Sequence, residues 1–260
     1  MPDFRARYGD WAAVAGASEG LGAAFATELA KRGMHLLLIA RRGDVLQAVA
    51  DGLRRDHGIE VRVLVQDLAS SGLADALSDA TADLELGVIV YNAAFVPVDS
   101  FLDLEDKALE QLLGVNVQGP VKFLRALLPS MRERGRGAVV LMSSLAGMQG
   151  SPRIAAYAAS KAFNTVLGES LRHELREHGI EVVVSCAGAI TTPRYLKSTS
   201  RIPPGTMTPD AVARETLDAL GKGPRVVPGA LNRFFAVLFD RLLPRRTAIR
   251  LMAGNTKDLT

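Results

Sequence analysis

The sequence has few residues of the kinds that hold metals or form disulfides. Its 260 residues include one cysteine, Cys186, and four histidines, His35, His57, His173 and His178. A lone cysteine cannot form a disulfide within the chain, and it fits a reducing compartment. The histidines and the cysteine show no spacing typical of metal ligands, so we expect no metal site.

Long apolar segments are also absent. The first residues, MPDFRARYGDW, lack the apolar core of a signal peptide. No stretch reaches the roughly 18 uninterrupted apolar residues that a membrane-spanning helix needs. We therefore expect a cytoplasmic protein. Hydrophobic residues make up 48% of the chain and charged residues 23%, which is typical of a soluble globular protein and excludes the disordered and fibrous classes.

The net charge is only +3, but it is unevenly distributed along the chain. Residues 220–260 contain eight lysines or arginines and two aspartates, whereas residues 1–219 carry more acidic than basic side chains. The basic character of the chain therefore belongs to its C-terminal segment. Because no recognisable nucleic-acid-binding module accompanies these charges, we expect no nucleic-acid partner.

Short apolar segments alternate along the chain with longer helical patterns. The predicted strands are Trp11–Ala15, His35–Ala40, Val61–Gln66, Leu86–Val90, Ala138–Met142 and Ile180–Ser185. The predicted helices are Gly20–Arg32, Asp44–Asp56, Leu102–Arg132 with a break around Gly114–Pro120, Ala156–His178 and Thr208–Leu220. Mostly non-alternating strands separated by helices are typical of buried parallel strands in repeated βαβ units. We predict a single α/β fold, a doubly wound Rossmann-type parallel sheet with helices on both faces.

Three glycines follow the first predicted strand, where the first long helix begins. Gly16, Gly20 and Gly22 allow a tight turn and a close backbone approach to a ligand. The helix N-terminus then offers N–H groups and the positive end of its dipole to a pyrophosphate. Their spacing, GxxxGxG, differs from the common GxGxxG, and a plain strand-to-helix turn is the alternative interpretation.

A tyrosine and a lysine lie four residues apart in the predicted helix 156–178. Tyr157 and Lys161 therefore share one face of that helix. An ammonium group near a phenol favours the phenolate and lowers the tyrosine pKa from about 10. Such a tyrosine can exchange a proton with an alcohol or carbonyl oxygen near neutral pH. In isolation the pair can also arise by chance.

Two serines, Ser143 and Ser144, directly follow the predicted strand Ala138–Met142. A hydroxyl at the carboxyl end of a buried strand lies where doubly wound sheets bind ligands. Capping of the next turn is the commoner role for a lone serine.

Together these residues resemble the short-chain dehydrogenase/reductase family, over essentially residues 10–220. The serine precedes the tyrosine by thirteen residues, as the family pattern expects. The resemblance implies that Tyr157 is the general acid/base and that Ser144 hydrogen-bonds the substrate carbonyl oxygen. It implies that Lys161 lowers the pKa of Tyr157 and holds the nicotinamide ribose. Asn116 would support a water-linked proton relay through Lys161. These four are the predicted catalytic residues.

The resemblance also implies a cofactor site on the loops that follow the strands. It assigns Asp67 to the adenine, Asn92 to bracing the central sheet and Thr192 to the nicotinamide carboxamide. The predicted cofactor-binding residues are Gly16, Ser18, Gly20, Leu21, Gly22, Arg41, Asp67, Leu68, Asn92, Ala93, Tyr157, Lys161, Gly188, Ile190 and Thr192. Four positions depart from the usual family pattern, all in the scaffold of this site: Ala15, Tyr91, Ala94 and Ala187.

The end of the second predicted strand bears on the choice of cofactor. Sites specific for NAD place a carboxylate there to bind the ribose 2′-OH. Here the strand ends in Ala40-Arg41-Arg42, without an acid, and the planar fork of an arginine suits a 2′-phosphate. We therefore predict NADP (NADPH) in preference to NAD, with Arg41 as the phosphate contact. Glu19 in the glycine loop mildly favours NAD, because a basic residue there would help to bind a phosphate. The alternative interpretation of Arg41 and Arg42 is that they are solvated side chains at the start of a loop.

The last forty residues lie beyond the part that the family pattern explains. We divide the chain into a catalytic domain, residues 1–220, which includes an irregular substrate loop at Pro193–Met207, and a basic amphipathic extension, residues 221–260. Helical spacing places Leu231, Phe234, Phe235, Leu238 and Leu242 on one apolar face. We expect this helix to end at Pro244 and its face to pack on the domain or at a subunit interface. Contact of residues 229–250 with a membrane or an acidic carrier protein is the alternative.

These features favour an NADP-dependent oxidoreductase that transfers a hydride between the nicotinamide and a small-molecule carbonyl/alcohol substrate. Apolar residues in the substrate loop, such as Leu196 and Ile202, favour an apolar substrate. One alternative is a 3-oxoacyl-(acyl-carrier) reductase. An alternative of another class is a non-catalytic, cofactor-binding regulator or scaffold. The resemblance further implies a homo-oligomer.

Overall fold

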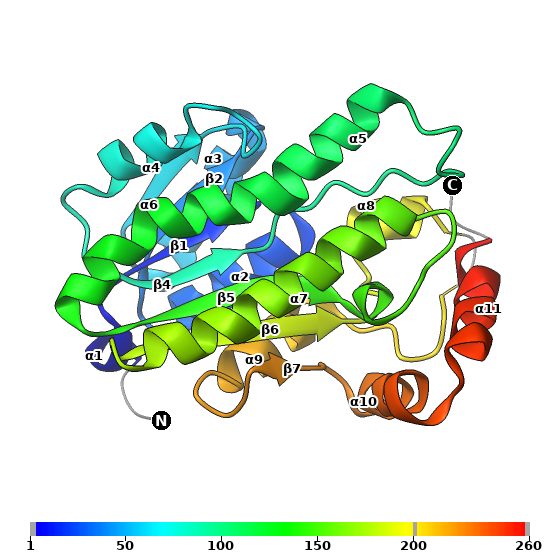
Figure 1. Cartoon of the computed structure of the whole chain (residues 1–260). Coiled ribbons are helices and arrows are strands. Elements are labelled where there is room, and N and C mark those ends of the chain that lie inside the picture. Colours follow the sequence, from blue (N-terminus) through cyan, green and yellow to red (C-terminus); the bar gives the residue numbers. More distant parts are fainter. Residues whose placement is uncertain (1–3, 200–201, 258–260) are drawn as a thin grey trace.

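A computed structural model describes residues 4–199 and 202–257. Seven parallel strands form one sheet in the order β3-β2-β1-β4-β5-β6-β7 (Figure 1). The strands are β1 (Trp11–Ala15), β2 (His35–Ala40), β3 (Val61–Val65), β4 (Leu86–Tyr91), β5 (Gly137–Ser144), β6 (Ile180–Ala187) and β7 (Arg225–Val226). The strand order reverses between β1 and β4, and ligands of doubly wound sheets bind beyond the carboxyl ends of the strands at such a point. The predicted fold is confirmed.

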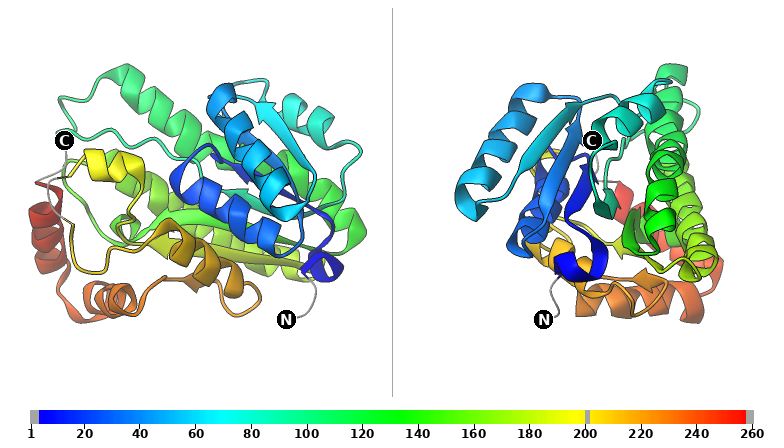
Figure 2. Two further views of the ribbon diagram at one scale, coloured as in Figure 1. Left: turned by 180° about the vertical axis from the view of Figure 1, so that it is seen from behind. Right: turned by 90° about the vertical axis from the view of Figure 1, so that its left-hand side faces the viewer.

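Helices cover both faces of the sheet, as Figure 2 shows. One face carries α2 (Gly20–Lys31), α3 (Gly43–His57) and α9 (Pro209–Asp218), and the other carries α4 (Leu73–Thr81), α5 (Asp106–Leu113), α6 (Gly119–Arg134) and α7 (Ala155–Arg176). The remaining helical segments are α1 (Phe4–Tyr8), the π-helix η1 (Gly114–Gln118), the 3-10 helix η2 (Leu145–Met148), α8 (Pro193–Lys197), α10 (Ala230–Val237), the π-helix η3 (Leu238–Leu242) and α11 (Arg245–Thr256).

The apolar strands hold the molecule together because each contributes to two cores. In β4 every residue is buried, and its side chains alternate between the two faces. Val88 and Val90 join the cluster under α2, α3 and α9, whereas Ile89 and Tyr91 join the cluster under α4, α6 and α7. The strand ends therefore form a rigid edge from which the loops of the site emerge.

Several local predictions differ from the structure. Helices α1 and α4 were not predicted, because they are only five and nine residues long. The helix predicted from Leu102 begins only at Asp106, and its expected break is the π-helix η1, through which α5 continues into α6. The segment expected to be irregular, Pro193–Met207, contains α8, and Met207 bridges to Ile190. Ser200 and Arg201 of this segment lie outside the described residues.

The C-terminal segment is joined closely to the rest of the fold. Strand β7 pairs with β6, so residues of the predicted extension complete the sheet. In α10, Asn232 is buried and its Nδ2 donates to the carbonyl oxygens of Gly205 and Pro228, each at 3.0 Å. A Cβ added to Gly188 would lie 2.8 Å from Asn232 Oδ1, so α10 packs directly on the loop after β6.

The apolar face predicted for this segment is only partly covered within the chain. Leu231, Phe234 and Leu242 are 43%, 60% and 69% exposed, respectively, whereas α10 buries Asn232 and Ala236. Packing of the whole face on the domain or at a subunit interface stays a prediction. The helix ends at Leu242, and Pro244 caps the start of α11. No helix among the described residues has the length and apolar character needed to cross a bilayer.

Candidate active site

The glycine loop between β1 and α2 lies beside the end of β4. Gly16 has a φ of +81°, and a Cβ there would lie 2.8 Å from Ala93 Cα, so only glycine fits this turn. Asn92 Nδ2 donates to Gly16 O at 3.1 Å, and the amides of Asn92 and Ala93 both donate to Ala15 O. The loop is therefore fixed to the centre of the sheet, where the strand order reverses.

Helix α2 starts from this loop without a side-chain cap. Its N-cap residue, Glu19, makes no capping hydrogen bond. The first N–H groups of α2, beginning at Leu21 and Gly22, are thus available to an anion, and the helix dipole favours one there. This arrangement fits a bound pyrophosphate. Gly20 has a φ of +56° and lies against Thr192, whose hydroxyl accepts from Tyr195 N and caps α8.

Ser144, Tyr157 and Lys161 come together at the carboxyl end of β5. Ser144 is the last residue of β5, and Tyr157 and Lys161 project from the first turns of α7. The hydroxyl of Ser144 accepts from Ala146 N at 3.2 Å and lies near enough to the Tyr157 hydroxyl to lower its pKa. Lys161 Nζ lies 5.6 Å from the centre of the Tyr157 ring and donates to Met142 O at 2.9 Å. A phenol, a hydroxyl and a buried ammonium thus face one small volume.

Burial dominates the electrostatics of this group. It raises the pKa of Tyr157, and the nearby hydroxyl of Ser144 only partly opposes that rise. The expectation that Lys161 lowers the pKa of Tyr157 stays a prediction, and any such effect acts against the rise that burial causes. Burial also lowers the pKa of Lys161 to about 8, since the residue is only 2% exposed.

Asn116 lies behind this group, inside the π-helix η1. Its side chain accepts from Phe95 N at 2.8 Å and donates to Phe95 O at 2.9 Å and to Ser160 Oγ at 3.1 Å. Its main-chain carbonyl accepts from Asn164 Nδ2 at 3.1 Å. Asn116 therefore ties η1 to both α7 and the loop after β4. The proton relay through Lys161 stays a prediction.

A pocket of about 110 Å³ opens at the end of the sheet. Seven of the predicted site residues line it: Leu21, Asn92, Ser144, Tyr157, Lys161, Gly188 and Ile190. Ala94, one of the departures from the family pattern, lines it as well. The phenol, the serine and the lysine thus border the same space as the cofactor loops.

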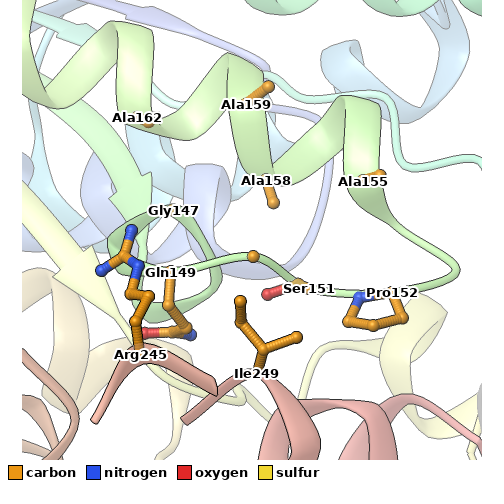
Figure 3. A pocket seen from close by; sticks show the side chains of 11 residues that line it. Gly147, Gln149, Ser151, Pro152, Ala155, Ala158, Ala159, Ala162, Arg245 and Ile249 are labelled. Atoms are coloured by element: carbon orange, nitrogen blue, oxygen red, sulfur yellow. The ribbon is translucent and has the colours of Figure 1, made fainter.

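A larger cavity, about 430 Å³, opens beside the start of α7. Figure 3 shows Ala155, Ala158 and Ala159 of α7 facing Arg245 and Ile249 of α11 across it. None of the predicted site residues lines this cavity. We therefore assign the chemistry to the smaller pocket.

Other predicted residues lie outside the small pocket. Asp67 accepts from Ala69 N at 3.0 Å and Leu68 is buried beneath the loop after β3. At the end of β2, Arg41 is exposed. The guanidinium of Arg42 reaches the glycine loop, where it lies 2.8 Å from Glu19 Oε1 and 3.3 Å from Ser18 Oγ.

Sequence analysis missed several residues that support the site. Ser160 Oγ donates to Tyr157 O, and Thr165 Oγ1 donates to Lys161 O and contacts Ser143, which the sequence analysis did name. Asn164 is buried, and its Oδ1 has no partner among the described residues. Residues 157, 160, 161 and 164 follow helical spacing, so a polar stripe on one face of the helix was a usable signal.

Comparisons with known proteins agree on one family. The model of the short chain dehydrogenase family matches residues 10–201. A 7beta-hydroxysteroid dehydrogenase of Clostridium sardiniense is 36% identical over 234 residues, covering 89% of this chain and 90% of the relative. A very-long-chain 3-oxoacyl-CoA reductase of Anas platyrhynchos is 31% identical over 263 residues, covering 96% of this chain and 81% of the relative.

Solved structures give the same result. A structure from work on 7beta-hydroxysteroid dehydrogenase stereoselectivity superposes with a TM-score of 0.90 at 29% identity, covering 96% of this chain and 99% of the other. A short-chain dehydrogenase from Sphingobium yanoikuyae in complex with NADPH has a TM-score of 0.78 at 26% identity, covering 88% and 92% of the two chains.

Proposed function

The chain belongs to the short-chain dehydrogenase/reductase family, and on that premise we propose that it reduces a bulky ketone with NADPH through Ser144, Tyr157 and Lys161. The observation that carries this proposal is the convergence of these three side chains on one small pocket beside the glycine loop. The reverse reaction, oxidation of the matching alcohol, uses the same groups.

In this mechanism, the nicotinamide supplies the hydride that the carbonyl carbon accepts. The hydroxyl of Ser144 donates to the carbonyl oxygen and orients it. Tyr157 then transfers its phenolic proton to that oxygen, which completes the alcohol and leaves a phenolate. The ammonium of Lys161, 5.6 Å from the ring centre, stabilises the phenolate. Because the pKa of Tyr157 is raised by burial, the phenol is protonated and ready to donate at neutral pH.

The preference for NADPH is supported by the two arginines at the end of β2. The NADPH complex of the Sphingobium relative shows that a protein of this fold, 26% identical to this chain, takes this cofactor. The uncapped N-terminus of α2 would hold the pyrophosphate, and the arginines would hold the 2′-phosphate. We also propose that the protein is cytoplasmic and that it forms a homo-oligomer.

The role of Arg41 is tested by Arg41→Ala. We expect NADPH binding to weaken by roughly 1.5–3 kcal/mol, the range for a hydrogen bond to a charged group. NADH binding should be nearly unchanged, because NADH has no 2′-phosphate. Titration of both cofactors into the wild type and the variant measures this, with Arg55→Ala at the far end of α3 as a control. Equal losses for the two cofactors would show that Arg41 does not contact the phosphate.

The proposed substrate is an apolar ketone of steroid size. Relatives named for hydroxysteroids and for very-long-chain 3-oxoacyl-CoA both act on large apolar molecules. Because the second of these relatives is named for a 3-oxoacyl-CoA, a 3-oxoacyl thioester is the alternative substrate. Parallel assays of a 7-oxosteroid and a long-chain 3-oxoacyl-CoA, each with NADPH and NADH, decide between them. No turnover in any of the four assays would favour a non-catalytic cofactor-binding protein.

We also propose that the C-terminal segment contacts an anionic lipid surface. Phe234 and Leu242 are exposed, and so are Arg241, Arg246 and Arg250 of the same C-terminal segment, which make no ion pair within the described residues. A two-fold contact between copies through this surface would bring like charges together, which is unfavourable. Bulky apolar side chains flanked by arginines instead match the boundary between lipid headgroups and acyl chains.

The test is sedimentation with vesicles of phosphatidylglycerol and phosphatidylcholine, compared with phosphatidylcholine alone. Changing Arg241, Arg246 and Arg250 together to Gln should weaken binding to the anionic vesicles on the order of 100-fold, since each contributes about 1 kcal/mol. The matched control changes Arg125, Arg132 and Arg176, which are also exposed and also lower the net charge by three. Point variants are needed because truncation would remove β7 and Asn232. Equal binding by both triple variants, or no binding by the wild type, would contradict the proposal.

A further inference from the structure

An ion pair lies where the cofactor's 2′-phosphate is expected. Arg42 and Glu19 are joined at 2.8 Å between guanidinium nitrogen and carboxylate oxygen, and the same nitrogen lies 3.3 Å from Ser18 Oγ. The two side chains are 51% and 46% exposed, respectively. The pair therefore spans from the end of β2 to the glycine loop in a position that a solute can reach.

The position of this pair follows from the backbone. The amides of Gly16 and Ala17 both donate to Ile39 O, so the glycine loop is fastened to the end of β2. In dinucleotide sites of this fold, the ribose 2′ position is read at that strand end, by a carboxylate for a hydroxyl or by an arginine for a phosphate. Here both kinds of residue are present, the carboxylate of Glu19 and the guanidinium of Arg42, and the two form an ion pair with each other.

We propose that Glu19 competes with the 2′-phosphate of NADPH for Arg42, and so lowers the selectivity of this enzyme for NADPH over NADH. The inference rests on the proposed NADPH-dependent function and deepens it. When the phosphate binds, its oxygens replace the carboxylate on the guanidinium, and Glu19 is left beside a second anion. When NADH binds, the Arg42–Glu19 pair stays intact.

The physical chemistry gives this competition a direction. An exposed ion pair is weak, because both groups are well solvated when apart. A phosphate with nearly two negative charges can therefore displace the carboxylate. At a separation of about 6 Å in a solvated site, the repulsion between that phosphate and Glu19 corresponds to roughly a ten-fold change in Kd. Glu19 thus opposes NADPH while leaving NADH almost unaffected.

The test is Glu19→Gln, which removes the charge and keeps the shape. We expect the Kd of NADPH to fall about ten-fold and the Kd of NADH to change less than two-fold, measured by fluorescence titration. Glu60→Gln is the matched control, since it removes one negative charge directly before β3, at the amino-terminal ends of the strands, whereas Glu19 lies at their carboxyl ends. Its Kd for NADPH should stay close to that of the wild type.

A second comparison separates competition for Arg42 from repulsion at a distance. In an Arg42→Gln background, Glu19→Gln should improve NADPH binding clearly less than it does in the wild type, because the guanidinium is no longer there to be released. An undiminished gain would overturn the competition.

Two other results would also overturn the inference. Equal shifts for both cofactors would show that Glu19 does not act on the 2′ position. Weaker NADH binding in Glu19→Gln, with NADPH unchanged, would show that the carboxylate receives the ribose hydroxyl instead. Either result leaves the proposed function in place if NADPH binds the wild type. Failure of the wild type to bind either cofactor would overturn both the function and this inference.

Discussion

Replacing Tyr157 by phenylalanine should reduce turnover with NADPH by at least about 100-fold, the range that a positioned proton donor contributes. The ring and its packing at the start of α7 remain, and only the phenolic hydroxyl, with its transferable proton, is lost. The Kd of NADPH should stay within a few-fold of the wild type, because the glycine loop and β2 are untouched. Steady-state kinetics and cofactor titration together measure these two quantities.

Tyr8→Phe is the matched control for this variant. Tyr8 also loses a hydroxyl hydrogen bond, to Glu181 at 2.8 Å, but it lies before β1 at the amino-terminal edge of the sheet. Its turnover should equal that of the wild type. If Tyr157→Phe keeps near-native turnover, the tyrosine is not the proton donor and the proposed mechanism is wrong.

Lys161→Met should lower turnover on the order of 100-fold and also change how stability depends on pH. The folded-state pKa of Lys161 is lowered to about 8 from 10.5. Between these values the unfolded chain binds more protons than the folded one, so this group makes the protein more stable as the pH rises. Below about pH 8 Lys161 is protonated in both the folded and the unfolded chain, so the folded state bears the full free-energy cost of burying its charge.

The expected size of this effect follows from the shift. A lowering of about 2.5 in pKa corresponds to about 3 kcal/mol. The free energy of unfolding of the wild type, relative to that of Lys161→Met, should therefore rise by up to about 3 kcal/mol between about pH 7 and pH 11. Urea unfolding of both proteins at several pH values measures it, and the hydrogen bond lost at Met142 O cancels from the trend. A constant difference would show that Lys161 is not held with a lowered pKa.

Lys122→Met serves as the control for turnover. Lys122 also donates from its ammonium to a backbone carbonyl, Ser70 O at 3.0 Å, but it belongs to α6 and does not line the pocket. Its turnover should match the wild type. If Lys122→Met lost a comparable amount of turnover, the loss in Lys161→Met would be a result of general destabilisation.

The sheet was predictable because its strands are nearly all apolar and both of its faces are covered. In β1 and β2 the predicted bounds agree with the structure to the residue. The parallel, doubly wound arrangement followed from the βαβ pattern, which allows few arrangements, whereas the order of the strands comes from the structure. The grouping of Ser144, Tyr157 and Lys161 in one pocket agrees with the resemblance, and the catalytic roles of these residues stay predictions until the variants are measured.

Two kinds of feature could not be predicted from the sequence: those set by the burial of side chains in the folded chain, and the choice of which of two adjacent residues makes a given contact. The direction of the pKa shift at Tyr157 is set by desolvation, which no spacing reveals. The sequence could not show that Arg42 is the arginine that reaches Glu19, because adjacent side chains at the end of a strand point in different directions. The apolar face near Phe234 was assigned to packing on the domain or at an interface, whereas the two residues that α10 buries within the chain are Ala236 and the polar Asn232.

The central claim is that this chain transfers a hydride from NADPH to a carbonyl carbon with a proton from Tyr157. The most direct measurement uses NADPH that carries deuterium at the transferable position of the nicotinamide, with a 7-oxosteroid and a long-chain 3-oxoacyl-CoA as ketones. Mass spectrometry of the product alcohol should find one deuterium on the former carbonyl carbon with the wild type, and product formation should fall at least about 100-fold with Tyr157→Phe. Product alcohol that carries no deuterium, or formation by the variant at the wild-type rate, would contradict the account.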